Sequence, residues 1–143
     1  GGFVDYNAGT IRSGSVSTPS LTASSNYARL LMGGFTGGNS GLVSQSYAMA
    51  NVEVLQIRGG GVALSGFAGE NIGSIRSSYC ATALSAVTGA EVNGFTSDHG
   101  SVSDCYYLPR CRYLRLRPGH RKHLRLLLSQ RRYLSLRGAG PSV

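Results

Sequence analysis

The sequence predicts an all-β fold: a parallel, right-handed β-solenoid of three to four coils, followed by an irregular basic tail. Three observations predict this fold. One sequence phrase recurs four times at near-constant spacing, glycine supplies 21 of 143 residues, and charged residues make up only 14% of the chain. Gly, Ser and Val are too dense at helix-interior positions for helical repeats. They favour short strands and tight turns instead.

The repeated phrase begins at Gly2, Gly34, Gly66 and Gly94, so its spacings are 32, 32 and 28 residues. It consists of Gly-Phe, three variable residues, Asn, one residue, Gly, one residue and Ile or Val, often followed by Ser-Tyr-Ala. Self-similarity at a fixed period is the signature of an architecture in which each repeat packs on the next. A four-stranded propeller blade is the alternative, although its period is usually about 40 residues or more.

A solenoid stacks equivalent residues of successive coils about 4.8 Å apart, so like apolar side chains face one another. The phenylalanines are expected to form a buried aromatic ladder, the β-branched residues a second ladder, and the tyrosines a third. The first copy lacks the tyrosine, because Ser15 stands there. In chain order the three ladders are Phe3, Phe35, Phe67 and Phe95; Ile11, Val43, Ile75 and Val102; and Tyr47, Tyr79 and Tyr106.

Each copy also carries a short polar stretch that predicts a turn. We expect its glycines to adopt positive φ, which glycine alone tolerates freely. We expect the asparagines two residues earlier to bond the turn backbone, because Asn also accepts left-handed geometry. The turn residues are Asn7, Asn39 and Asn71 with Gly9, Gly41, Gly73 and Gly100; the fourth copy is one residue shorter here and has His99 nearby.

Residues 1 to about 108 resemble the GLUG motif family, glycine-rich repeats named for a Gly-Leu-x-Gly core. Gly-Phe-Thr-Gly at 34–37 and Gly-Phe-Ala-Gly at 66–69 match that core best, whereas the copies at 2–5 and 94–97 lack the final glycine. The resemblance implies a large secreted or cell-surface bacterial protein, adhesin-like or associated with IgA-specific metallopeptidases. In that family the repeats are accessory, so the resemblance supplies no catalytic residue.

The sequence predicts no catalytic, cofactor or metal site. Asp98 and Asp104 with His99 could form an acid–base cluster, but they are expected to be turn residues of the last coil. Cys105, Cys111, His120 and His123 match no common zinc spacing.

The chain has three cysteines, so at least one has no partner within it. Cys80 replaces Ala48 and is expected to be a small buried residue. Cys105 falls two positions before the residue stacked on Cys80, about 8 Å away, so a disulfide between them would need a register shift. The cysteine redox state is left open.

Residues 1–108 and 109–143 differ sharply in charge. The first segment holds four arginines and six acids, whereas the second holds nine Arg, one Lys and no acid. The tail repeats a three-residue phrase every ten residues, a basic residue followed by Tyr or His and then Leu. Examples are Arg112-Tyr113-Leu114 and Lys122-His123-Leu124. Three interpretations remain: a poorly ordered segment from a shifted reading frame, a basic β-arm, or a nucleic-acid-binding patch.

The repeats predict a non-catalytic scaffold, adhesive or stalk-like, and the resemblance implies that it belongs to a secreted or cell-surface bacterial protein. The alternative is an accessory region of a β-helix polysaccharide-degrading enzyme or of a secreted peptidase. The ligand is unknown; a host glycan or protein is the candidate partner. Arg12 and Arg76, with Gln45 expected between them and Tyr6 nearby, could contact an anionic glycan. Nucleic acid is expected only non-specifically through the tail, and no apolar run is long enough to span a membrane.

Overall fold

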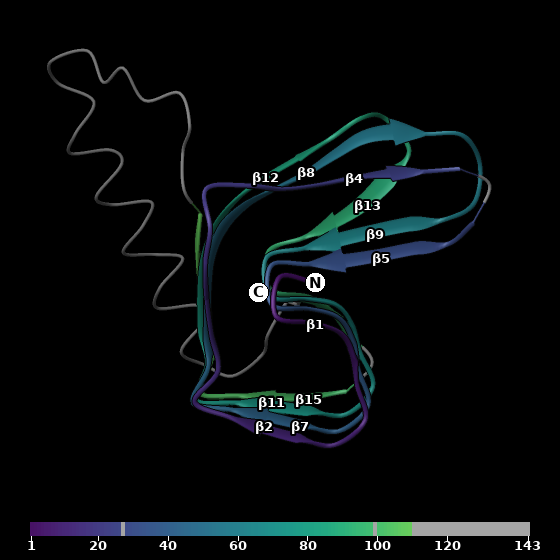
Figure 1. The fold of residues 1–143 in the computed structure, drawn as a ribbon. Helices are drawn as coiled ribbons and strands as arrows, with labels where there is room; N and C mark the ends of the chain where they lie inside the picture. Colours follow the sequence, from purple (N-terminus) through teal and green to yellow (C-terminus); the bar gives the residue numbers. More distant parts are fainter. Residues whose placement is uncertain (27, 99, 110–143) are drawn as a thin grey trace, which may run out of the picture.

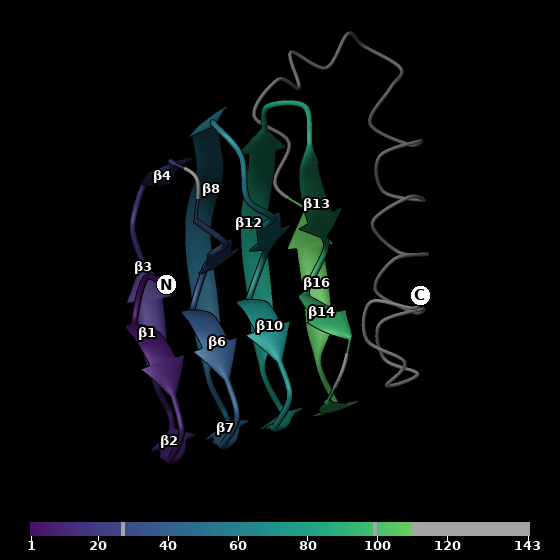
Figure 2. The same ribbon diagram turned by 90° about the vertical axis from the view of Figure 1, so that its right-hand side faces the viewer.

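The computed structural model describes residues 1–26, 28–98 and 100–109, with only the backbone of residue 98. These residues form a parallel β-solenoid without helices, which confirms the predicted fold class. Figure 1 looks along the solenoid axis, and Figure 2 shows the coils side by side from the first (purple) to the last (green). The chain runs clockwise as it recedes from the viewer of Figure 1, so the solenoid is right-handed. The predicted tail beyond Pro109, with Cys111, His120 and His123, lies outside the described residues.

Successive coils contribute strands to four sheets in turn, although residues 94–109 reach only the first three, and all pairings are parallel. Sheet A consists of β1 (Val4–Asn7), β6 (Thr36–Asn39), β10 (Ala68–Asn71) and β14 (Thr96–Asp98). Sheet B consists of β2 (Thr10–Arg12), β7 (Leu42–Ser44), β11 (Ser74–Arg76) and β15 (Ser101–Ser103). Sheet C consists of β3 (Ser15–Ser17), β4 (Leu21–Ser25), β8 (Tyr47–Ile57), β12 (Tyr79–Ala86) and β16 (Tyr106–Pro109). Sheet D consists of β5 (Leu30–Gly33), β9 (Val62–Ser65) and β13 (Ala90–Asn93).

We number the coils 1 (residues 2–33), 2 (34–65), 3 (66–93) and 4 (94–109). The register follows the sequence repeat: in sheet A, Thr36 pairs with Val4 on one side and Ala68 on the other. Between coils 3 and 4 the register slips by one residue after Ala68, at the turn that the fourth copy shortens. Sheet D still pairs Val62 with Ala90, so the four residues that coil 3 lacks are removed between β12 and β13.

The cross-section has two lobes, each with its own core (Figure 1). Sheets A and B and the first part of sheet C enclose the lower lobe, while the second part of sheet C and sheet D enclose the upper lobe. The lower core comprises Val16, Phe35, Val43, Ala48, Phe67, Ala68, Ile75, Cys80, Phe95 and Cys105. The upper core comprises Met32, Ala50, Val52, Val54, Val62 and Leu64. Strand β8 serves both, because its buried residues alternate with less buried ones along its length.

The glycine that opens each repeat lies at the waist between the two lobes. A Cβ at Gly34 would lie 2.3 Å from the carbonyl oxygen of Gly66 and 3.3–3.4 Å from the side chains of Thr82 and Ala48 in sheet C. A side chain at Gly34 would therefore clash with the Gly66 carbonyl of coil 3 and crowd sheet C. The Gly-Phe pair therefore combines a close crossing at the waist with a large side chain in the lower core.

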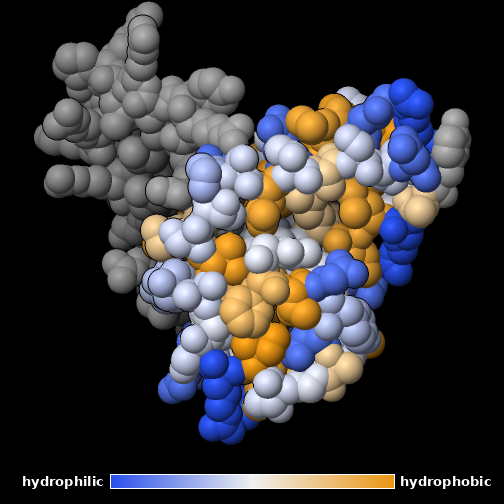
Figure 3. Space-filling view, in the orientation of Figure 1, coloured by the Kyte–Doolittle hydropathy of each residue, from blue (hydrophilic) through white to orange (hydrophobic). Residues whose placement is uncertain are grey.

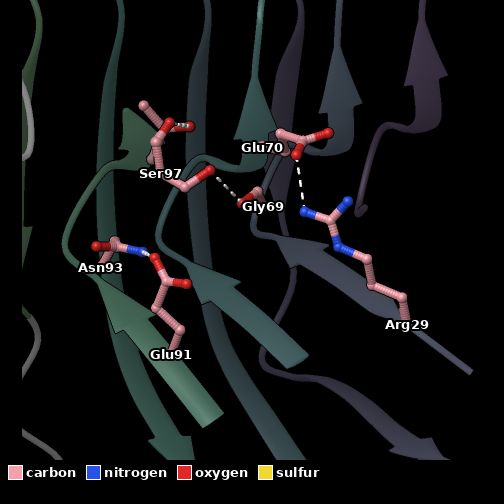
Figure 4. Close-up of polar contacts among 7 residues, drawn as sticks. Arg29, Gly69, Glu70, Glu91, Asn93 and Ser97 are labelled. Carbon is pink, nitrogen blue, oxygen red and sulfur yellow. Dashed lines mark hydrogen bonds and ion pairs between the residues drawn. The ribbon is translucent and has the colours of Figure 1, made fainter. Parts of the chain in front are cut away.

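Few ionic contacts join the coils in the described part of the chain. Arg29, just before β5, places Nη2 2.8 Å from Oε1 of Glu70 on β10, and Ser97 Oγ donates to the Gly69 carbonyl at 3.0 Å (Figure 4). The Arg29 side chain is 64% exposed, and exposed ion pairs contribute little to stability. Backbone hydrogen bonds of the sheets and the side-chain ladders described next therefore hold the coils together.

Candidate functional site

The phenylalanine ladder runs through the lower core as the repeat predicts. Successive ring centroids of Phe3, Phe35, Phe67 and Phe95 lie 4.8 Å apart, with interplanar angles of 4–10°. Phe35 and Phe67 are completely buried, but Phe3 is 50% exposed, so the expectation that all four rings are buried is wrong at Phe3. The reason is geometric: β1 is an edge strand of sheet A, and among the described residues no strand covers its outer side.

The other two apolar ladders also follow the predicted register. Ile75 pairs with Val43 on one side and Val102 on the other, and Val43 pairs with Ile11, all directed at the lower core. Tyr47, Tyr79 and Tyr106 lie on the opposite, outward side of sheet C, half-buried, with ring centroids 5.3 and 5.0 Å apart. Burial, together with the neighbouring phenols of Tyr106 and Tyr47, raises the pKa of Tyr79. Ser15 takes the tyrosine position in coil 1.

The asparagines form a buried polar ladder along the edge of the lower lobe. Asn7 Nδ2 donates to Asn39 Oδ1, and Asn39 Nδ2 donates to Asn71 Oδ1, each at 2.8 Å. The amides of Asn7 and Asn39 also bond their turns, as expected: Asn39 Nδ2 donates to the Gly41 carbonyl at 3.2 Å and to the Ser74 carbonyl at 3.3 Å. Chains of buried hydrogen bonds fix one geometry because an unsatisfied member is costly.

The turn glycines are needed for a different reason from the predicted one. None of Gly9, Gly41, Gly73 and Gly100 has positive φ. A Cβ at Gly41 would instead lie 2.0 Å from the Gly9 carbonyl oxygen, and one at Gly73 would lie 2.2 Å from that of Gly41. These glycines allow the backbones of adjacent coils to touch, so the expectation of left-handed glycines is corrected to one of close axial packing.

Left-handed geometry occurs instead at the next corner of each coil, where the repeated phrase does not predict it. Ser13, Gln45, Ser77 and Asp104 have φ between 50° and 55° and recur once per coil. These four residues share a position in the repeat but no residue type. Ser, Gln and Asp have no common preference for left-handed geometry, so the sequence does not predict it here. Asp104, considered above as a catalytic acid, is thus a corner residue, while the side chains of Asp98 and His99 lie outside the described structure.

A serine ladder follows this corner and ends in a thiol. The Gly14 N–H donates to Ser46 Oγ and the Ser46 N–H donates to Ser78 Oγ, each at 3.1 Å. Cys105 takes the same position in coil 4, and its thiol donates to the Ser103 carbonyl at 3.1 Å. Cys80 and Cys105 are both buried free thiols, and burial raises the pKa of Cys105 to about 11. Burial also raises the pKa of Cys80 well above its usual value.

The outer face of sheet B carries a shallow groove of about 400 Å³, lined by Gly41, Leu42, Ser74, Ile75, Arg76, Ser101 and Ser103. Arg12 and Arg76 occupy equivalent positions, with Ser44 and not Gln45 between them, because the register pairs Ser44 with both. Among the described residues neither guanidinium has an acidic partner. The groove therefore combines small hydroxyl side chains with a free positive charge.

Within the described ranges, no group of three or more His, Cys, Asp or Glu side chains lies close enough to hold a metal ion. The described part of the chain also contains no helix long and apolar enough to cross a membrane.

The architecture defines the chain as a parallel β-solenoid repeat protein. Comparison with protein-family models, with curated proteins and with solved structures finds no match.

Proposed function

We propose that this chain is a non-catalytic repeat scaffold of a secreted or cell-surface bacterial protein, serving adhesion or as an extended stalk. The observation that carries the proposal is the unbroken stacking of Phe, Ile/Val and Asn side chains along the axis. In a solenoid each coil contacts only its neighbours, so length can grow without redesigning the core. The similarity of the Gly-Phe-x-Gly phrases to GLUG repeats supports the same setting.

The outer face of sheet B is the surface through which such a scaffold would contact a ligand. It presents Arg12 and Arg76 beside the small hydroxyl side chains of the groove. Guanidinium groups pair well with carboxylate or sulfate, and hydroxyl groups bond to sugar hydroxyls. We therefore propose an acidic glycan on a host surface as the ligand.

Binding of the full chain to immobilised acidic and neutral glycans tests this function. We expect selective binding to acidic glycans that falls in Arg12→Ala and Arg76→Ala. Arg58→Ala is the matched control, because it removes the same charge just after β8, in the upper lobe. Equal losses in all three variants would show only charge attraction and would contradict the proposed surface.

The alternative is an accessory region of a polysaccharide-degrading enzyme or of a secreted peptidase. The groove on sheet B favours it, since a groove can hold a polysaccharide chain. Incubation of the purified chain with acidic polysaccharides and with peptides is expected to give no cleavage. Turnover that is lost in Asp104→Asn would replace the scaffold proposal with a catalytic one.

A further inference from the structure

The outer face of sheet B carries a positive charge on every second coil. Sheet B forms the lower edge of the molecule in Figures 1 and 3, and Figure 3 shows hydrophilic side chains along this edge. On each strand the residue after the core-facing Ile or Val points outward, and the register stacks these residues in one column. We call it the charged column; from coil 1 to coil 4 it consists of Arg12, Ser44, Arg76 and Ser103.

A second outward column stands two residues earlier on each strand, about 7 Å from the charged column. We call it the hydroxyl column, because most of its members carry a hydroxyl group; it consists of Thr10, Leu42, Ser74 and Ser101. The groove lies between the two columns, since members of both line it in coils 2 to 4. A chain-like ligand in the groove would therefore run along the solenoid axis, with hydroxyl groups on one side and guanidinium groups on the other.

The coil spacing sets the distance between the charges. Successive Phe rings, one per coil, lie 4.8 Å apart, so the positions of Arg12 and Arg76 are separated by two such spacings. An extended glycan advances by a similar distance with each pyranose ring, so a glycan along the groove places one sugar over each coil. A carboxylate accepts paired hydrogen bonds from a guanidinium, and the hydroxyl column can bond sugar hydroxyls. Sugars over coils 1 and 3 would therefore be the acidic ones.

The other two coils suit neutral sugars. Ser44 and Ser103 offer a hydroxyl and no charge at the equivalent positions of coils 2 and 4. Asp104 follows Ser103 directly and is exposed, so its carboxylate would repel an acidic sugar over coil 4. A glycan with an acid on every sugar would thus meet no cationic partner on coil 2 and repulsion on coil 4.

We propose that this face binds a linear glycan that lies along the solenoid axis and carries an acidic group on every second sugar. This specificity rests on the function proposed above, to which it adds the direction of the ligand and the spacing of its charges. Alternation of arginine and serine also keeps like charges off adjacent coils. If that were its only role, moving one arginine would change stability but not the preference for charge spacing in the ligand.

The probes are the disaccharide and the tetrasaccharide of hyaluronan, in which glucuronate alternates with neutral N-acetylglucosamine. The tetrasaccharide carries two carboxylates with one neutral sugar between them, whereas the disaccharide carries one. Calorimetric titration of the full chain is expected to show binding at least about tenfold tighter for the tetrasaccharide, because its second carboxylate reaches the second guanidinium. Arg12→Ala is expected to remove this gain and to leave the disaccharide bound through Arg76.

The decisive variant combines Ser44→Arg with Arg76→Ser, which keeps the net charge but places the two arginines on adjacent coils. We expect the tetrasaccharide gain to disappear while disaccharide binding persists. Ser44 is only 9% exposed, so a second variant uses an exposed position instead. It combines Ser103→Arg with Arg76→Ser, which separates the arginines by three coils, and the expectation is the same. Thermal unfolding of each variant verifies its fold.

A gain that persists in both variants would show general charge attraction, to the basic tail included, and would overturn the proposal. Equal affinity of the unchanged chain for the two oligosaccharides would also overturn it. In either case, retention of acidic glycans on the immobilised panel, with loss in Arg12→Ala and Arg76→Ala, would leave the proposed function intact. Absence of binding to every acidic glycan would contradict the proposed function and this specificity together.

Discussion

Asn39 holds the centre of the buried amide ladder, so its truncation tests whether that ladder stabilises the solenoid. It accepts from Asn7 Nδ2 and donates to Asn71 Oδ1, each at 2.8 Å, and it is 1% exposed. Asn39→Ala leaves both neighbouring amides without this partner in a dry environment. At about 1–3 kcal/mol for each of these two buried amides, we expect the free energy of unfolding to fall by about 2–6 kcal/mol.

The matched control is Asn7→Ala, at the open end of the same ladder. It removes one inter-coil amide–amide bond and leaves only one neighbouring amide, that of Asn39, without its partner, so we expect a loss of about 1–3 kcal/mol. Urea unfolding followed by circular dichroism gives both values from the shift in midpoint at constant slope. Equal losses for the two variants would refute the reasoning, because position within the ladder would then make no difference.

Three further variants probe the other ladders. Phe67→Ala removes a fully buried ring and is expected to lower the free energy of unfolding by about 3–5 kcal/mol, whereas Phe3→Ala, at a half-exposed ring, should lower it by about 1 kcal/mol. Gly41→Ala forces a methyl against the Gly9 carbonyl and should lower it by about 1–3 kcal/mol, against little change for Gly61→Ala; similar values in the two would argue against close axial packing. The raised pKa of Cys105 means that the unfolded chain releases the thiol proton first, so stability should be complete below about pH 9 and should fall as the pH rises towards 11. Cys105→Ser, which restores the residue of the preceding coils, should weaken this alkaline loss, and an unchanged loss would point to another group.

The sequence predicted the parts of the fold that recur chemically. The Phe, Ile/Val and Tyr positions match between copies, and the structure stacks them in the predicted register. The upper lobe escaped prediction because its coils share a shape but not residues: Val52 pairs with Leu21 on one side and Leu84 on the other, and Val54 pairs with Ala23 and Ala86. In these strands the coils share only the alternation of buried and exposed positions. A comparison of residue identities does not detect such a pattern.

The turn glycines show a second limit of sequence reasoning. Glycine is compatible with positive φ and with close backbone approach, and sequence alone does not separate these two causes. The structure assigns close approach to Gly41 and positive φ to Gln45, which no propensity argument would have chosen. The groove on sheet B escaped prediction because its serines are far apart in the sequence and come from strands of different coils.

The tip of the upper lobe is where this architecture accommodates its largest change of length. Coil 3 omits four residues between β12 and β13, yet sheet D regains its pairing at Ala90 and the phenylalanine ladder continues from Phe67 to Phe95. A change of length at the tip therefore does not alter the stacking of the ladders between coils. For protein engineering, the tip is thus a site for insertions. Peptides grafted between Ile57 and Val62 would be displayed there, and several coils would display them as a regularly spaced array along one edge.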